Sequence, residues 1–106
     1  MRELFLFIPN IMTGCYIIHS KKLDRFYIGS TTNFESRLEK HNTHFHGNHR
    51  FTSTASDWEL FLFIATDENS GAVRLERKIK SKKSAVYIRN LKKYPELLNK
   101  LLRETL

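Results

Sequence analysis

The sequence predicts an α+β domain in which helices flank a three-stranded antiparallel sheet. Two β-rich segments, residues 14–19 and 24–29, are separated by a short turn and are typical of a hairpin. A near-continuous apolar run at residues 58–65 has strand length and supplies the third strand. Stretches with apolar residues at helical spacing follow the second and third strands, so we expect helices to pack around the sheet.

The length and composition indicate one domain. We assign residues 14–106 of the 106-residue chain, including the C-terminal helices, to that domain, and residues 1–13 to an N-terminal extension or arm. No apolar run approaches the roughly 18–20 residues that span a bilayer, so we expect no membrane partner. Cys15 is the single cysteine, which rules out an internal disulfide and fits a reducing, cytoplasmic environment.

The chain is basic, with 18 Lys and Arg against 11 Asp and Glu, a formal charge of +7 and an isoelectric point near 9.8. Because counterion release drives the binding of basic domains to nucleic acid, this balance indicates a nucleic-acid partner. The plainer alternative is a domain with a basic surface and no polyanionic partner. An anionic membrane surface fits less well, since the basic residues are spread over several elements.

The hairpin predicts that two tyrosines share one face of the sheet. With residues 20–23 as a four-residue turn, Tyr16 lies opposite Tyr27. Residues directly opposite each other in an antiparallel pair project to the same face. We therefore expect the two tyrosines to stand side by side, while Cys15 and Ile17 point to the other face.

The second strand leads into a helix over residues 33–42. We expect the chain to turn at Gly29 and to enter the helix through a capping signal. Thr32, with Glu35 three residues later, fits the reciprocal pattern in which each side chain satisfies a free backbone N–H of the other.

One side of this helix combines apolar and polar residues. At about 100° per residue, four positions fall within one arc of roughly 100°. They are Phe34, Arg37, Leu38 and His41. An arginine and a histidine beside the apolar anchors are not typical of a plain amphipathic helix.

Residues 43–57 are polar, without apolar periodicity, and are expected to form an exposed loop. Residues 58–65 are apolar at almost every position, which predicts a strand buried on both faces. A second helix follows over residues 71–82, with acidic residues and a cap supplied by residues 67–70.

This second helix has an apolar face that includes one carboxylate. The face comprises Ala72, Leu75, Glu76 and Ile79, and the opposite side carries Arg74, Arg77 and Lys78, with Lys80 on its flank. A third helix is expected from about Ser84 to about Lys92. A fourth begins at Pro95, a residue suited to a first helical turn, with Leu97, Leu98, Leu101 and Leu102 as its apolar stripe.

Five residues form a candidate site for phosphate chemistry: Tyr16, Tyr27, Arg37, His41 and Glu76. Arg37 and His41 are one turn apart, so both can reach one ligand, and a guanidinium suits a phosphate and an oxyanionic transition state. Glu76 can hold one hard cation, Mg²⁺ or Mn²⁺. A tyrosine has a pKa near 10, so a role as general base requires a cation or His41 nearby.

The structural alternative for these residues is also open. Tyrosines are common in strands, Arg37 can pair with Glu39 or Glu76, and His41 can cap a helix end. A separate histidine group, His41, His44, His46 and His49, is compatible with a metal cluster. However, its spacing is irregular and it has no cysteine, so a polar loop that touches DNA is favoured.

Four segments together resemble the GIY-YIG nuclease domain superfamily, in particular its small, single-domain bacterial type. These are G-C-Y at residues 14–16, Y-I-G at 27–29, S-T-T-N-F-E-S-R-L-E-K-H-N at 30–42 and A-V-R-L-E-R-K-I-K-S-K-K-S at 72–84. The resemblance extends over residues 14–91. Residues 1–12 lie outside it, as an extension or as an upstream start with Met12 as the alternative.

The resemblance implies an endonuclease that hydrolyses phosphodiester bonds in DNA with a single divalent ion and no small-molecule cofactor. The family's paired tyrosines fall on Tyr16 and Tyr27, its arginine on Arg37 and its metal-binding glutamate on Glu76; the histidine of some members falls on His41. A tyrosine is the family's general base, and which of the two serves is left open. Cys15 replaces the usual isoleucine of the first motif.

With one site per chain, we expect a nicked product from a monomer or a weak dimer. The expected DNA contacts are Gly29, Lys40, Arg50, Lys78, Lys82 and Asn90, the last being the nearest match to an asparagine that supports the site in many family members. The main alternative function is a non-catalytic nucleic-acid-binding module on the same fold. A third alternative, a structural interaction domain, leaves the charge and Glu76 unexplained.

Overall fold

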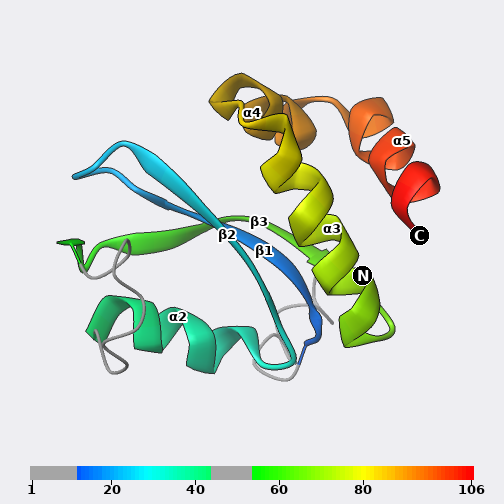
Figure 1. Cartoon of the computed structure of the whole chain (residues 1–106). Coiled ribbons are helices and arrows are strands. Elements are labelled where there is room, and N and C mark those ends of the chain that lie inside the picture. Colours follow the sequence, from blue (N-terminus) through cyan, green and yellow to red (C-terminus); the bar gives the residue numbers. More distant parts are fainter. Residues whose placement is uncertain (1–11, 44–53) are drawn as a thin grey trace.

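The computed structural model describes residues 12–43 and 54–106. In these ranges a three-stranded antiparallel sheet in the order β2-β1-β3 is flanked by four helices (Figure 1). The strands are β1 (Gly14–Ser20), β2 (Arg25–Thr31) and β3 (Trp58–Ala65), and the helices are α2 (Phe34–Thr43), α3 (Asn69–Lys82), α4 (Ala85–Lys93) and α5 (Pro95–Thr105). The predicted α+β fold is confirmed. Within the described residues, no helix has the length and hydropathy to cross a membrane.

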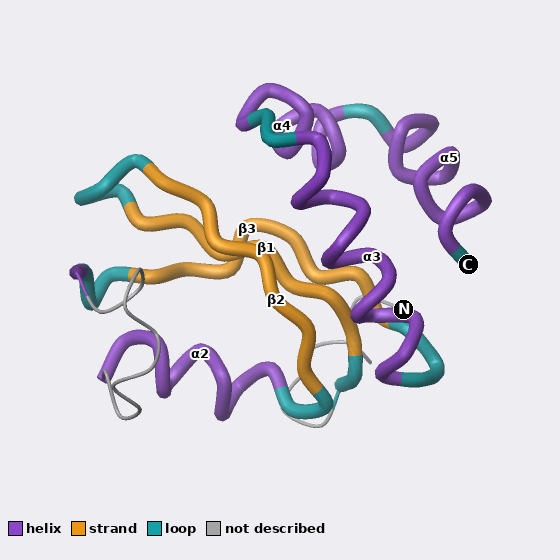
Figure 2. Tube along the Cα trace, in the orientation of Figure 1, coloured by secondary structure: helices purple, strands orange, loops and turns teal. Residues whose placement is uncertain are grey.

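The central strand β1 is buried on both faces. Cys15 and Ile17 are fully buried on one face, in an apolar cluster with side chains of α3, α4 and α5. Tyr16 and Ile18 point to the other face and pack with Phe34 of α2. Figure 2 shows α2 on one side of the sheet and the three later helices on the other.

The hairpin register differs from the predicted one by two residues. Tyr16 lies opposite Gly29, and Ile18 lies opposite Tyr27. The turn comprises residues 21–24, in which Asp24 adopts a left-handed conformation with φ of 49°, tolerated well by aspartate. Because side chains alternate with a period of two, the shift keeps both tyrosines on the same face but makes them diagonal neighbours.

Gly29 lies inside β2 and does not turn the chain, so that prediction is wrong. It has no positive φ. A Cβ at this position would come within 2.8 Å of Cε2 of Tyr16, closer than real Cβ contacts. Glycine is therefore needed here because the Tyr16 ring lies directly on the β2 backbone.

The helix α2 is capped by Asn33 and not by Thr32. The Ser36 N–H donates to Oδ1 of Asn33 at 3.1 Å, and the Asn33 N–H donates to Oγ1 of Thr31 at 2.9 Å. Because β2 continues to Thr31, the first free helical N–H groups lie one residue further along than predicted.

The strand β3 has the predicted bounds, but it is not buried on both faces. It forms one edge of the sheet, and Leu60 is 41% exposed. Its pairing with β1 is irregular, because Ile17 pairs with Leu62 and Ile18 pairs with Leu60. The strand that is buried at almost every position is instead the central strand β1. The preceding predicted loop lies mostly outside the described residues, although Ala55, which is described, is buried.

The later helices agree closely with their predicted periodicity. Ala72, Leu75 and Ile79 of α3 are at most 1% exposed. The helix begins two residues earlier than predicted, at Asn69, and its N-cap residue Glu68 makes no side-chain capping bond, so the predicted cap is wrong. Ser84 caps α4 by accepting the N–H of Tyr87, and α5 begins at Pro95.

Candidate active site

A buried hydrogen bond between Tyr16 and His41 forms the centre of the site. The Tyr16 hydroxyl lies 2.8 Å from Nε2 of His41, and both residues are 1% exposed. Burial raises the pKa of Tyr16 well above its usual value, and neighbouring Tyr27 raises it further. The phenol therefore keeps its proton at neutral pH, and it donates that proton to His41 in the tautomer whose Nε2 carries no hydrogen.

Tyr27 completes a group of three rings. Its ring centroid lies 4.8 Å from that of His41 and 6.4 Å from that of Tyr16. The two tyrosines come from the paired strands β1 and β2, and His41 comes from the last turn of α2. The structure thus brings together three of the five predicted site residues, on the sheet face covered by α2.

Arg37 lies one turn before His41 and is half-buried. Its positive charge lowers the pKa of Tyr16, whereas the charge of Glu76 raises it, so both charges act on the Tyr16 hydroxyl. With the described residues Arg37 forms no ion pair, and Glu39 and Glu76 are among those residues. The Arg37 guanidinium is therefore not paired with the carboxylate of Glu39 or of Glu76.

Glu76 lies at the border between the apolar and exposed sides of α3, with its side chain 21% exposed. The Lys80 ammonium donates to its Oε2 at 2.6 Å and also lies 6.0 Å from the ring centroid of Tyr27. Lys80 therefore links α3 to β2 beside the tyrosine group. The sequence pattern placed Lys80 only on the flank of the basic side of the helix. Its i, i+4 spacing from Glu76 nevertheless indicates that the two side chains can pair.

The donor set around Glu76 suits a hydrated cation. Within the described ranges, no three His, Cys, Asp or Glu side chains converge, which excludes a closed zinc cage built from those residues. A single carboxylate is compatible with Mg²⁺ or Mn²⁺, which keep several waters and bind substrate phosphate. Such an ion would share the Glu76 carboxylate with Lys80 or displace that lysine.

Two contacts that the sequence did not predict hold α2 over the site. The Phe34 ring lies 5.5 Å from that of Tyr16 and 5.6 Å from that of Phe63. At the other end of α2, the Asn42 amide donates to the Trp58 carbonyl at 3.0 Å and accepts the Trp58 N–H at 2.8 Å. No local pattern marks Asn42, because its partner is sixteen residues away and belongs to the edge strand.

The candidate DNA contacts are more dispersed. Lys40 is half-buried on α2, and Lys78 and Lys82 lie on α3, with the Lys82 ammonium 5.4 Å from the Tyr87 ring centroid. Asn90 belongs to α4, and within the described part of the chain its side chain forms no hydrogen bond to the tyrosine group.

Four further candidates lie outside the described residues: Arg50, His44, His46 and His49. The fourth histidine of the predicted group, His41, is described and is hydrogen-bonded to Tyr16.

The comparisons with known proteins agree with this arrangement. A family model described as the GIY-YIG catalytic domain matches residues 12–93, a range that includes all three strands and the helices α2 to α4. Neither the curated proteins nor the solved structures gave a match. Because the family model covers most of the chain, the protein belongs to the GIY-YIG family, whose domain is of nuclease type and takes nucleic acid as its substrate.

Proposed function

We propose that this protein is a metal-dependent endonuclease that hydrolyses phosphodiester bonds in DNA. The observation that carries the proposal is the buried hydrogen bond of 2.8 Å between Tyr16 and His41, with the charges of Arg37 and Glu76 acting on the same hydroxyl. A core tyrosine needs only one neutral partner, whereas this one has a titratable histidine as its partner and a nearby guanidinium that forms no ion pair with the described residues. Such a combination suits proton transfer beside a phosphate.

In this mechanism Tyr16 and His41 act as a relay. The raised pKa makes the Tyr16 phenol a weak base by itself. As an attacking water gives a proton to the Tyr16 oxygen, the phenol proton passes to Nε2 of His41, which becomes an imidazolium. The resulting hydroxide attacks phosphorus, and the P–O bond breaks with its electron pair on the leaving oxygen, which then takes a proton from solvent water. Tyr27, whose ring contacts His41, orients the water.

Arg37 and Glu76 have electrostatic roles. The Arg37 guanidinium binds two oxygens of the scissile phosphate and stabilises the charge that increases in the transition state. Glu76 would hold one Mg²⁺ or Mn²⁺, which would supply Lewis-acid stabilisation of the negative charge that increases in the reaction. With one such site per chain, each encounter yields a nick, and double-strand cleavage requires two chains or two encounters.

The test is a nicking assay on supercoiled plasmid with Mg²⁺ or Mn²⁺. We expect wild type to convert the plasmid to the open circle, and Glu76→Ala and Arg37→Ala to be about 100- to 1,000-fold slower. Glu96→Ala and Arg103→Ala, matched changes on exposed positions of α5, are the controls and are expected to nick at the wild-type rate.

Equal activity in wild type and Glu76→Ala would indicate a contaminating nuclease and would overturn the proposal. Binding without cleavage across several DNA structures would instead favour a non-catalytic nucleic-acid-binding module on the same fold.

A further inference from the structure

The positive charge of the chain is concentrated on two helices. Nine of the 18 Lys and Arg residues lie between Arg74 and Lys93, against a single carboxylate, that of Glu76. This segment comprises most of α3 and all of α4. The candidate active site therefore lies beside the most basic part of the molecule.

The cations of α3 follow one another around the helix, starting at Glu76. At about 100° per residue, Lys80 lies about 40° from Glu76, Arg77 about 100°, Arg74 about 160° and Lys78 about 200°. The buried residues of α3, which are Gly71, Ala72, Leu75 and Ile79, fall between about 220° and 320°. The exposed side of α3 thus carries a continuous cationic arc that begins at the candidate metal-binding carboxylate.

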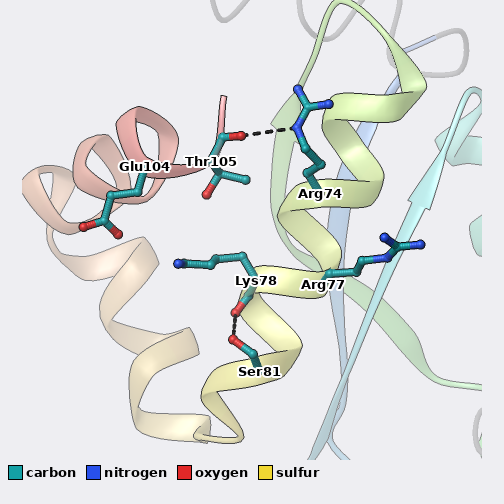
Figure 3. Close-up of a pocket in the computed structure, with 6 residues that line it drawn as sticks. All are labelled: Arg74, Arg77, Lys78, Ser81, Glu104 and Thr105. Atoms are coloured by element: carbon teal, nitrogen blue, oxygen red, sulfur yellow. Dashed lines mark hydrogen bonds between the residues drawn. The ribbon is translucent and has the colours of Figure 1, made fainter.

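The far end of this arc opens into a groove between α3 and α5 (Figure 3). The groove has a volume of about 410 Å³ and is lined by Arg74, Arg77, Lys78, Ser81, Glu104 and Thr105. Arg74 donates from Nε to the Thr105 carbonyl at 3.3 Å, which holds its guanidinium at the edge of the groove. In Figure 3, Lys78 extends toward α5, whereas Arg77 extends to the opposite side of α3.

These cations are not paired with any carboxylate among the described residues. In the part of the chain that the structure describes, Arg74, Arg77 and Lys78 form no ion pair, although Glu104 lines the same groove. The groove is shallow and open, which suits a strand of phosphates passing over it better than an enclosed small anion. Charge complementarity and continuity with the site therefore both favour a polyanion.

We propose that Arg74, Arg77 and Lys78, here called the α3 phosphate surface, bind the DNA backbone that flanks the scissile bond. The strand leaves the site beside Glu76, passes Lys80 and Arg77, and reaches Arg74 and Lys78 at the groove. Such contacts to phosphate position the DNA without reading its sequence. This inference rests on the proposed function for its choice of DNA as the partner.

The test measures how binding to a fluorescein-labelled DNA duplex depends on salt, without divalent ions, so that no cleavage occurs. The variant is the full chain carrying Arg74→Gln, Arg77→Gln and Lys78→Gln. Each lost phosphate contact should reduce the slope of log K against log salt concentration by about 0.9, so the triple variant should lose about 2 to 3 in slope. Its affinity should fall on the order of 10- to 100-fold at low salt.

The matched control carries Lys21→Gln, Lys22→Gln and Arg25→Gln, three exposed cations at the hairpin turn. It removes the same net charge from a different surface. Circular dichroism melting of both variants checks that each is folded. A slope that is unchanged in the α3 variant, or reduced equally in both, would overturn the inference.

Nicking separates this inference from the proposed function. Glu76→Ala should bind with the wild-type slope but should not nick. The α3 variant should need a higher protein concentration than wild type to reach half of its maximal nicking rate. A reduced slope without any nicking by wild type would support the α3 phosphate surface and contradict the proposed endonuclease.

Discussion

The two faces of β1 differ in what they bury. On one face, Cys15 and Ile17 are covered by α3, α4 and α5 in a large cluster of apolar side chains. On the other face, Tyr16 and Ile18 lie in a smaller cluster under α2, which also encloses His41 and a buried hydrogen bond. The same strand therefore contributes alternate residues to a core of mainly apolar side chains and to a core that contains a buried hydrogen bond between two polar side chains.

This difference indicates how a small domain can bury the polar side chains of Tyr16 and His41. Desolvation of a phenol and an imidazole is costly unless each satisfies the other, as Tyr16 and His41 do. Apolar burial on the Cys15 face holds the strand in place without any polar partner. We therefore expect substitutions on the Tyr16 face to affect activity more than stability, and substitutions on the Cys15 face to do the reverse.

The largest effect on activity is expected from Tyr16→Phe. This change removes the hydroxyl of the proposed relay, so the nicking rate should fall about 100- to 10,000-fold. The free energy of unfolding should fall by only about 1–3 kcal/mol, the cost of one lost buried hydrogen bond. Plasmid nicking and urea unfolding measure the two quantities. Tyr94→Phe, at an exposed tyrosine, is the control and should change neither.

The largest effect on stability is expected from Leu75→Ala in the apolar cluster. Leu75 is fully buried, and its truncation should lower the free energy of unfolding by about 2–5 kcal/mol. The nicking rate per folded molecule should stay near that of wild type, as measured below the unfolding temperature. A large loss of activity without a loss of stability would show that the two faces do not separate these properties.

A smaller effect is expected from Gly29→Ala, which disturbs the Tyr16 face through the backbone. The added Cβ would collide with the Tyr16 ring, so the variant should be destabilised by about 1–3 kcal/mol and should also lose nicking activity. Gly71→Ala is the control, because its Cβ would meet only side-chain atoms at 3.3 Å or more. Thermal melting of the control should be unchanged or slightly higher.

A still smaller effect is expected from Lys80→Met, at the edge where α3 meets the tyrosine group. Loss of the ammonium 2.6 Å from Glu76 should lower the Mg²⁺ concentration for half-maximal nicking about twofold, since i, i+4 pairs contribute about 0.3–0.5 kcal/mol. Lys100→Met, on an exposed position of α5, should leave that concentration unchanged. A fall in the maximal rate with an unchanged Mg²⁺ requirement would contradict this effect of Lys80 on Glu76.

The smallest effect on activity is expected from Cys15→Ala, because the thiol lies on the face of β1 away from the tyrosine group; its linkage to folding appears only in alkali. Burial raises the pKa of the Cys15 thiol from 9.0 to about 12. Since the folded pKa lies above the unfolded one, the folded state favours the protonated thiol, and this contribution is complete below pH 9 and lost as the pH rises toward 12. Urea unfolding on either side of pH 9 should show a steeper decline for wild type than for Cys15→Ala. Equal declines would contradict the linkage.

Local patterns predicted most of the elements, because each depends on residues close together in the chain. The apolar run of β3 gave its bounds, Pro95 marked the start of α5, and the helical period placed Glu76 beside the buried residues of α3. The cap was predicted at Thr32 but lies at Asn33, because the length of β2 depends on its pairing with β1, which no local pattern contains.

The sequence by itself determined the fold class, the shared face of Tyr16 and Tyr27, and the chemical groups available. Side-chain alternation and helical periodicity are properties of the local backbone, so they are readable without the fold. Only the tertiary structure decided the hairpin register, the burial of the Tyr16–His41 hydrogen bond, the need for glycine at position 29 and the approach of Lys80 to the Tyr27 ring. Each depends on packing, which sets how closely groups approach and how far water is excluded from them.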